Sequence, residues 1–183
     1  MEDEDESVRM GAAGLSVTES GMSDPQGLEC QGVLTSRSVF TLDDPVFGAL
    51  IYDPDAETFD GEVTLDGDPV AVSINMVDAG SLVVPSLAYD GFRGIREKMK
   101  RAEALIREWF TESDNEWALD EDEQPLDSGY LDGHLTLCDL SFEGDGDLVL
   151  WYAMLGEFDC LWGHSLLVTV ERDGAFVFEG LVG

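Results

Sequence analysis

The stretch that decides the fold is FDGEVTLDGDPVAVSINM, residues 59–76. Apolar and polar side chains alternate on both sides of Asp66-Gly67, and this period of two is typical of strands buried on one face. An Asp-Gly pair between two such runs is a strong hairpin signal. Residues 59–65 and 70–76 are therefore predicted to form two antiparallel strands.

The chain before this hairpin continues the same pattern. Residues 47–52, FGALIY, are apolar and β-prone, and Asp53-Pro54-Asp55 ends them. With the hairpin, this run predicts an antiparallel meander of three strands. Residues 39–42 lead into it through a turn predicted at 43–45.

A different period follows the meander. Between residues 95 and 110 the apolar positions recur at intervals of three and four, which predicts an amphipathic helix. The helix could begin as early as Ser86 or Asp90, with Gly91 and Gly94 loosening its first turns. The apolar positions are Ile95, Met99, Ala102, Leu105, Ile106, Trp109 and Phe110.

The last third of the chain returns to strand patterns. Candidate strands are residues 131–142, 147–152, 165–170 and 175–178, with Gly-containing turns at 143–146 and 172–174. The predicted fold class is α+β: an antiparallel β-meander, one long amphipathic helix and a second antiparallel β-meander, with the helix covering the sheet. Residues 1–36 are predicted to be an acidic, disordered tail, and residues 37–183 a single α+β domain.

Charge excludes several classes of protein. The 183 residues contain 40 acidic and 9 basic side chains, for a net charge of −31. Direct binding to nucleic acid or to anionic lipid needs many more cations, so neither is expected. Disorder throughout is excluded because 44% of the residues are hydrophobic. The acidic residues 1–6 are unlike a signal peptide, and no apolar run could span a bilayer, so the expected location is the cytoplasm.

Two histidines and two cysteines have the composition of a zinc site: His134, Cys138, Cys160 and His164. On a strand, however, residues four apart are separated by about 13 Å, which one metal ion cannot bridge. Ser165 and His164 would point to opposite faces of a strand, which argues against a nucleophile–base pair. We therefore expect no metal, no cofactor, no catalytic residues and reduced thiols.

Basic residues are concentrated in one segment. Six of the nine lie between residues 93 and 107, and two interpretations remain open. They could offset the acidic stretch at 112–123, or they could form a polarised docking surface. These residues are Arg93, Arg96, Lys98, Lys100, Arg101 and Arg107.

The run FDCLWGHSLLV, residues 158–168, resembles the C-terminal strand of an uncharacterised bacterial family, a domain of unknown function. Glycines 174, 180 and 183 follow it as they do in that family, and residues 47–50 and 59–61 resemble its "FG-x-L … F-x-G" entry. The resemblance covers about residues 38–183. It implies a small intracellular immunity or adaptor module with a binding role and brings no catalytic residues.

These observations predict a non-enzymatic protein-binding module, most concretely an immunity-type inhibitor of a basic partner such as a toxin nuclease. The oligomeric state stays open. The predicted partner-binding residues are the acidic stretch and two turn acids: Glu112, Asp114, Glu116, Asp120, Glu121, Asp122, Glu123, Asp145 and Asp147.

Three alternatives remain. A DNA mimic would need carboxylates in a row at roughly phosphate spacing. An enzyme or metal protein would be built around His164. An acidic housekeeping domain of a halophilic or high-GC organism would carry its charge as a solvated surface without a specific partner.

Overall fold

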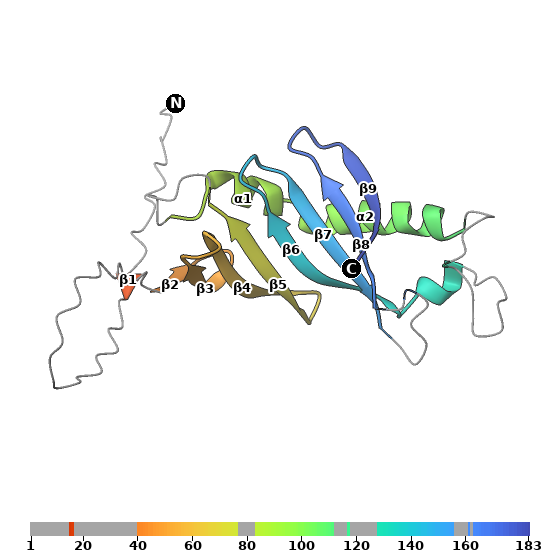
Figure 1. Cartoon of the computed structure of the whole chain (residues 1–183), viewed down its shortest axis with the longest axis horizontal. Helices are drawn as coiled ribbons and strands as arrows, with labels where there is room; N and C mark the ends of the chain where they lie inside the picture. The colour runs from red at the N-terminus through yellow and green to blue at the C-terminus, as the bar shows by residue number, and fades with distance from the viewer. Residues whose placement is uncertain are drawn as a thin grey trace, which may run out of the picture.

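A computed structural model describes residues 15–16, 40–76, 83–111, 117, 128–155, 161 and 163–183. In this part of the chain the strands form a single sheet in which each strand neighbours the next in sequence (Figure 1). The strands are β1 (Leu15–Ser16), β2 (Phe40–Asp44), β3 (Gly48–Asp53), β4 (Thr58–Leu65), β5 (Asp68–Asn75), β6 (Leu135–Phe142), β7 (Leu148–Met154), β8 (Ser165–Val170) and β9 (Phe176–Val182).

The predicted hairpin is confirmed. Strands β4 and β5 pair antiparallel with Val63 opposite Val70, and Asp66-Gly67 makes the turn. Both turn residues have positive φ, 53° and 106°, as the tight turns that suit the twist of paired strands require. Val70, Val72 and Ile74 are buried on one face of β5, as their alternation predicts.

The two meanders are joined into one sheet by a parallel pair of strands. The prediction contained only antiparallel pairs. Strands β5 and β6 pair in parallel, from Ala71 opposite Asp139 to Ile74 opposite Phe142. A parallel pair needs a long crossover, because the chain must return to the end of the sheet from which it started. The helical segment between β5 and β6 belongs to that crossover.

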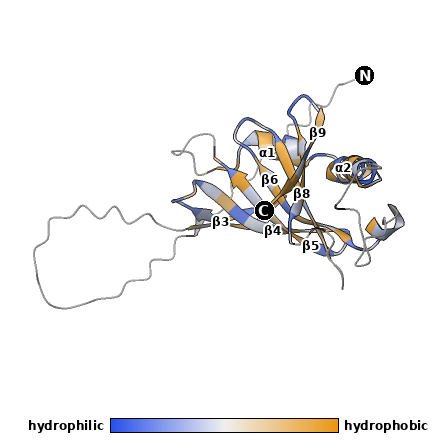
Figure 2. Ribbon diagram, turned by 45° about the vertical axis from the view of Figure 1, so that its right-hand side comes forward, coloured by the Kyte–Doolittle hydropathy of each residue, from blue (hydrophilic) through white to orange (hydrophobic). Residues whose placement is uncertain are grey.

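The helix predicted over residues 95–110 is present, but a second, short helix precedes it. Two helices, α1 (Ser86–Phe92) and α2 (Ile95–Phe110), are separated by Arg93 and Gly94. Gly94 has φ of 68°, a left-handed conformation that ends a right-handed helix and suits glycine. The predicted face of α2 is confirmed, and Figure 2 shows hydrophobic and hydrophilic residues around its circumference. Its buried residues are Ile95, Ala102, Ile106 and Phe110.

Several strand boundaries also differ from the predictions. Residues 128–131 form a 3-10 helix, η1 (Ser128–Leu131), so β6 begins only at Leu135. Strand β2 continues to Asp44 because the Asp44 carboxylate accepts the amides of Val46 and Phe47 and moves the turn forward. Strand β9 extends past its predicted end to Val182.

Both helices pack on the same face of the sheet. The Tyr152 hydroxyl on β7 donates to the Met99 carbonyl of α2 at 3.4 Å, and an added Cβ at Gly91 of α1 would lie 3.0 Å from the Phe142 ring on β6. Trp109 of α2 packs on Phe178 of β9. This face therefore holds the core.

The predicted tail lies almost entirely outside the described residues. Leu15 and Ser16 are described, and they pair antiparallel with Leu42 and Thr41 of β2. The disordered tail and the domain boundary at residue 37 stay predictions. No helix in the described part of the chain is long and apolar enough to cross a membrane.

Candidate protein-binding face

The sheet has a second face that points away from α1 and α2, which we call the outer face. It carries the residues that alternate with the core positions, and no helix of the described segments packs on it. Its members on β4 to β9 include Asp60, Glu62, Ser73, Asp139, Ser141, Val149, Trp151, Leu167, Thr169 and Val177.

Strand register brings acids and a tryptophan together on this face. Glu62 on β4 is opposite Ala71, which is opposite Asp139 on β6, which is opposite Trp151 on β7. Neighbouring strands lie about 4.8 Å apart, so side chains in one such row touch or nearly touch. Leu167 on β8 continues the row beyond Trp151.

The outer face thus has two chemically distinct halves. On β4 to β6 it is polar and acidic, and on β7 to β9 it offers Val149, Trp151, Leu167 and Val177. These apolar side chains are half-buried, except Val177, which is exposed. Trp151 stands at the boundary between the halves. An aromatic anchor beside charged groups is the composition common at protein interfaces.

Asp139 is the unusual residue of the outer face. Its Oδ1 is buried, and none of the described residues donates a hydrogen bond to it. Burial and then the neighbouring Asp60 carboxylate raise the pKa of Asp139 above its usual range. A buried acceptor without a partner costs about 1–3 kcal/mol, so Asp139 destabilises the free protein.

We expect the substitution Asp139→Asn to stabilise the protein by about 1 kcal/mol at neutral pH, since the amide carries no charge to desolvate. The raised pKa means that the folded state binds the proton more tightly than the unfolded state. The penalty is therefore full above the folded pKa and disappears below about pH 4. Urea unfolding at several pH values measures this, and an advantage of the variant that persists at low pH would contradict it.

Of the predicted partner-binding residues, the seven acids between 112 and 123 lie outside the described residues. Asp145 and Asp147 lie in the turn between β6 and β7, away from the outer face rows. Asp145 Oδ1 accepts the Asp147 amide at 3.2 Å, and Asp147 Oδ1 accepts the Arg172 amide at 2.9 Å. These two carboxylates hold turns together, and their role in binding stays a prediction.

All six cations of the 93–107 segment have intramolecular partners. Four make exposed ion pairs with nearby acids, each of which contributes little to stability. The pairs are Arg93–Asp90, Arg96–Asp66, Lys100–Glu97 and Arg107–Asp132. Lys98 donates to main-chain carbonyls, and Arg101 lies 4.3 Å from the centre of the Phe176 ring. The acids at 112–123 lie outside the described residues, so the first interpretation stays a prediction.

Three of the four residues considered for zinc lie in the described part of the chain, and these three do not form a metal site. His134 precedes β6, where its Nδ1 is 2.6 Å from the Tyr130 carbonyl oxygen and its ring stacks on Tyr130. Cys138 is exposed at the β6 bulge, and His164 contacts Trp117. Cys160 lies outside the described residues. Across the described part of the chain, no three His, Cys, Asp or Glu side chains gather as metal ligands would.

Sequence reasoning missed the outer face as a site. Residues 147–152 were assigned to a strand, and extending the alternation would have placed Trp151 opposite the core face. Asp139 and Trp151 lie near Glu62 only because β5 and β6 pair in parallel. Short sequence motifs do not reveal that pairing.

A family model described as "Uncharacterized protein conserved in bacteria (DUF2262)" matches residues 44–181. No curated protein and no solved structure matches the chain.

Proposed function

The chain belongs to the DUF2262 family of uncharacterized bacterial proteins, and from that premise we propose that it is a cytoplasmic, non-enzymatic protein-binding module whose outer face receives a basic protein. In its most concrete form, the module is an immunity-type inhibitor that covers the substrate groove of a toxin nuclease. Its partner supplies cations to the acidic half of the outer face and an apolar contact to the other half.

The observation that carries this proposal is the unpartnered Asp139 carboxylate opposite Trp151. Local rules of stability are most often broken where function requires it. A partner's Arg or Lys would give Asp139 Oδ1 the donor that the free protein lacks, and desolvated charge pairs of this kind are strong in interfaces. Trp151 lies beside Asp139, and tryptophan is among the residue types most enriched in binding hot spots.

The charge distribution supports the same proposal. Within the described residues, no ion pair reaches Asp60, Glu62 or Asp139, while the cations of residues 93–107 are taken up elsewhere. A net charge of −31 creates a field that attracts a basic partner from a distance and speeds association. Nuclease grooves that hold phosphates are basic, so such a protein inhibits by occupying the groove and needs no chemistry of its own.

If the neighbouring open reading frame encodes a basic protein, that product is the partner to test, and we expect Glu62→Lys to slow association with it about tenfold at low salt. The side chain of Glu62 is exposed, so the fold tolerates the change. Asp68→Lys is the matched control, because this substitution changes the net charge by the same amount. Asp68 is also exposed, but it lies outside the outer face rows. Biolayer interferometry at several salt concentrations measures the rates.

The proposal fails if both charge reversals slow association equally, because a general field would then explain the effect without the outer face. It also fails if the neighbouring product is acidic, or is basic and does not bind the chain.

A further inference from the structure

The antiparallel ladder between β3 and β4 stops before β4 ends. Its last pair on the way to the β4–β5 turn is Ile51 opposite Asp60. On its other side β4 stays paired with β5 as far as Leu65 opposite Asp68. Among the described strands, residues 62–65 therefore have a ladder partner on the β5 side alone.

Pro69 determines where the free main-chain groups of β4 point. It lies opposite Thr64 and has no N–H, so these two residues cannot form a hydrogen-bonded pair of the ladder. Hydrogen-bonded and non-hydrogen-bonded pairs alternate along antiparallel strands, and the main-chain groups of a non-hydrogen-bonded residue point to the opposite side. The N–H and C=O of Thr64, and those of Glu62 two residues earlier, are therefore directed away from β5. They form an edge to which a further strand can pair.

A groove of about 370 Å³ lies along this edge. Gly48 lines it on the β3 side and Thr64 on the β4 side, and both residues are exposed. The half-buried Phe92 lines it from α1. An extended chain rises about 3.3 Å per residue, so a segment of about four residues is enough to follow residues 62–65.

The acids beside the groove are not neutralised by the fold. Glu62 lines the groove, and Asp60 precedes it on the same face of β4; both are exposed. Neither takes part in an ion pair within the described residues. Arg96 also lines the groove, but its guanidinium pairs with Asp66 at 2.8 Å. The edge therefore favours a segment that brings cations of its own.

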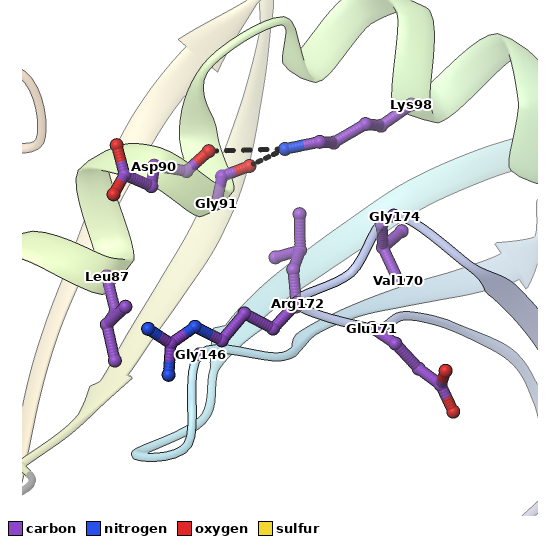
Figure 3. Close-up of a pocket in the computed structure, with 10 residues that line it drawn as sticks. Leu87, Asp90, Gly91, Lys98, Gly146, Val170, Glu171, Arg172 and Gly174 are labelled. Carbon is purple, nitrogen blue, oxygen red and sulfur yellow. Dashed lines mark hydrogen bonds between the residues drawn. The ribbon is translucent and has the colours of Figure 1, made fainter.

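A different pocket, of about 220 Å³, lies near the C-terminus of α1 and is drawn in Figure 3. The Lys98 ammonium that lines it donates to the carbonyl oxygens of Gly91 at 2.5 Å and of Asp90 at 3.3 Å. A lysine at the last carbonyls of a helix satisfies acceptors that the helix leaves open, which is a structural role. The edge of β4 differs, because no described strand pairs with the main-chain groups that it presents.

We propose that the edge of β4 binds an extended segment of a partner protein in which Lys or Arg alternates with apolar residues. The segment adds an antiparallel strand beside residues 62–65, and its main chain exchanges hydrogen bonds with Glu62 and Thr64. Its cations lie on the same face of the sheet as the Glu62 carboxylate, while its apolar side chains point into the groove toward Phe92. A second copy of the chain is not the expected occupant, because two chains of charge −31 repel each other.

The test titrates the full chain with a blocked hexapeptide of alternating lysine and valine, and follows amide exchange by NMR. We expect a Kd on the order of 100 μM. At saturation the Glu62 and Thr64 amides exchange at least about tenfold more slowly, because they gain hydrogen bonds. Glu62→Gln weakens binding about threefold, since the cross-strand charge pair is lost. Glu108→Gln is the matched control and binds like the unchanged protein, because Glu108 is exposed near the other end of α2.

Two modified peptides separate strand pairing from general attraction to an acidic chain. In the proposed register the lysine N–H groups face β4 and the valine N–H groups face away, because residues in a hydrogen-bonded pair have side chains on one face. N-methylation of the three lysines therefore abolishes binding, while N-methylation of the three valines leaves it. Both peptides keep the same charge and the same side chains. Equal binding of the two peptides, or unchanged exchange at Glu62 and Thr64, would overturn the proposal.

Two further outcomes would also overturn it. Slow exchange of the Glu62 and Thr64 amides in the chain alone would mean that the chain itself already covers the edge. Dimers that protect these amides would make a second copy the occupant. The inference does not depend on the proposed outer-face function, since we expect Trp151→Ala to bind the peptide like the unchanged protein. The edge and the outer face can thus fail separately.

Discussion

Replacing Trp151 by alanine weakens binding of the basic partner by at least about 30-fold, the loss expected when a hot-spot residue of about 2 kcal/mol is truncated. Trp151 on β7 is half-buried on the outer face. It lies between Asp139 on β6 and Leu167 on β8. A partner that covers the acidic half must also cover this indole. The loss appears mainly as faster dissociation, because short-range contacts hold the formed complex.

The matched control for this substitution is Val46→Ala. Val46 is 44% exposed in the turn between β2 and β3, away from the rows that carry Trp151. The Val46→Ala substitution removes apolar surface and leaves the residues of the outer face unchanged. Isothermal titration with both variants, each shown by its urea unfolding curve to be folded, measures the effect. Equal affinity of Trp151→Ala and the unchanged protein would exclude the outer face as the binding surface.

The second large effect concerns stability: Phe47→Ala lowers the free energy of unfolding by about 3–5 kcal/mol. The Phe47 side chain is 1% exposed. Its ring centre lies 5.2 Å from that of Phe92 at the end of α1 and 5.3 Å from that of Phe142 on β6, both edge-on. One side chain thus ties the first meander to the helical crossover and to the second meander.

Urea unfolding at neutral pH checks this prediction. Val46→Ala serves again as the control. The Val46 side chain next to Phe47 is 44% exposed, and we expect its truncation to change the free energy of unfolding by about 0.5 kcal/mol or less. A value for Phe47→Ala within about 1 kcal/mol of the unchanged protein would mean that the aromatic cluster does not join the parts of the sheet.

Local patterns predicted most of the elements, because each depends on neighbours in sequence. The Asp66-Gly67 turn is confirmed, and so is the buried face of Ile95–Phe110. The break at Gly94 was underestimated, since a glycine within a helical pattern does not reveal that its φ is positive. Leu131 is buried in η1, although its apolar character suited a strand equally well.

The candidate site was harder to predict, because it depends on contacts between distant segments. Asp139 is unusual only because Asp60 on β4 lies near it and because its Oδ1 lacks a donor. In a chain with 40 acidic residues nothing in the sequence separates it from the others. Asp145 and Asp147 were predicted as turn carboxylates, and in the structure both accept main-chain amides in turns.

The most direct test of the outer face as a binding surface compares two tryptophans within one sample. The indole N–H signals of Trp151 and Trp109 are assigned by substitution and followed while the proposed basic partner is added. Trp109 packs on Phe178 on the helix side of the sheet and is the internal reference. We predict that the Trp151 signal shifts or broadens at stoichiometric partner while that of Trp109 stays in place. A complex that moves the Trp109 signal and leaves that of Trp151 unchanged would contradict it.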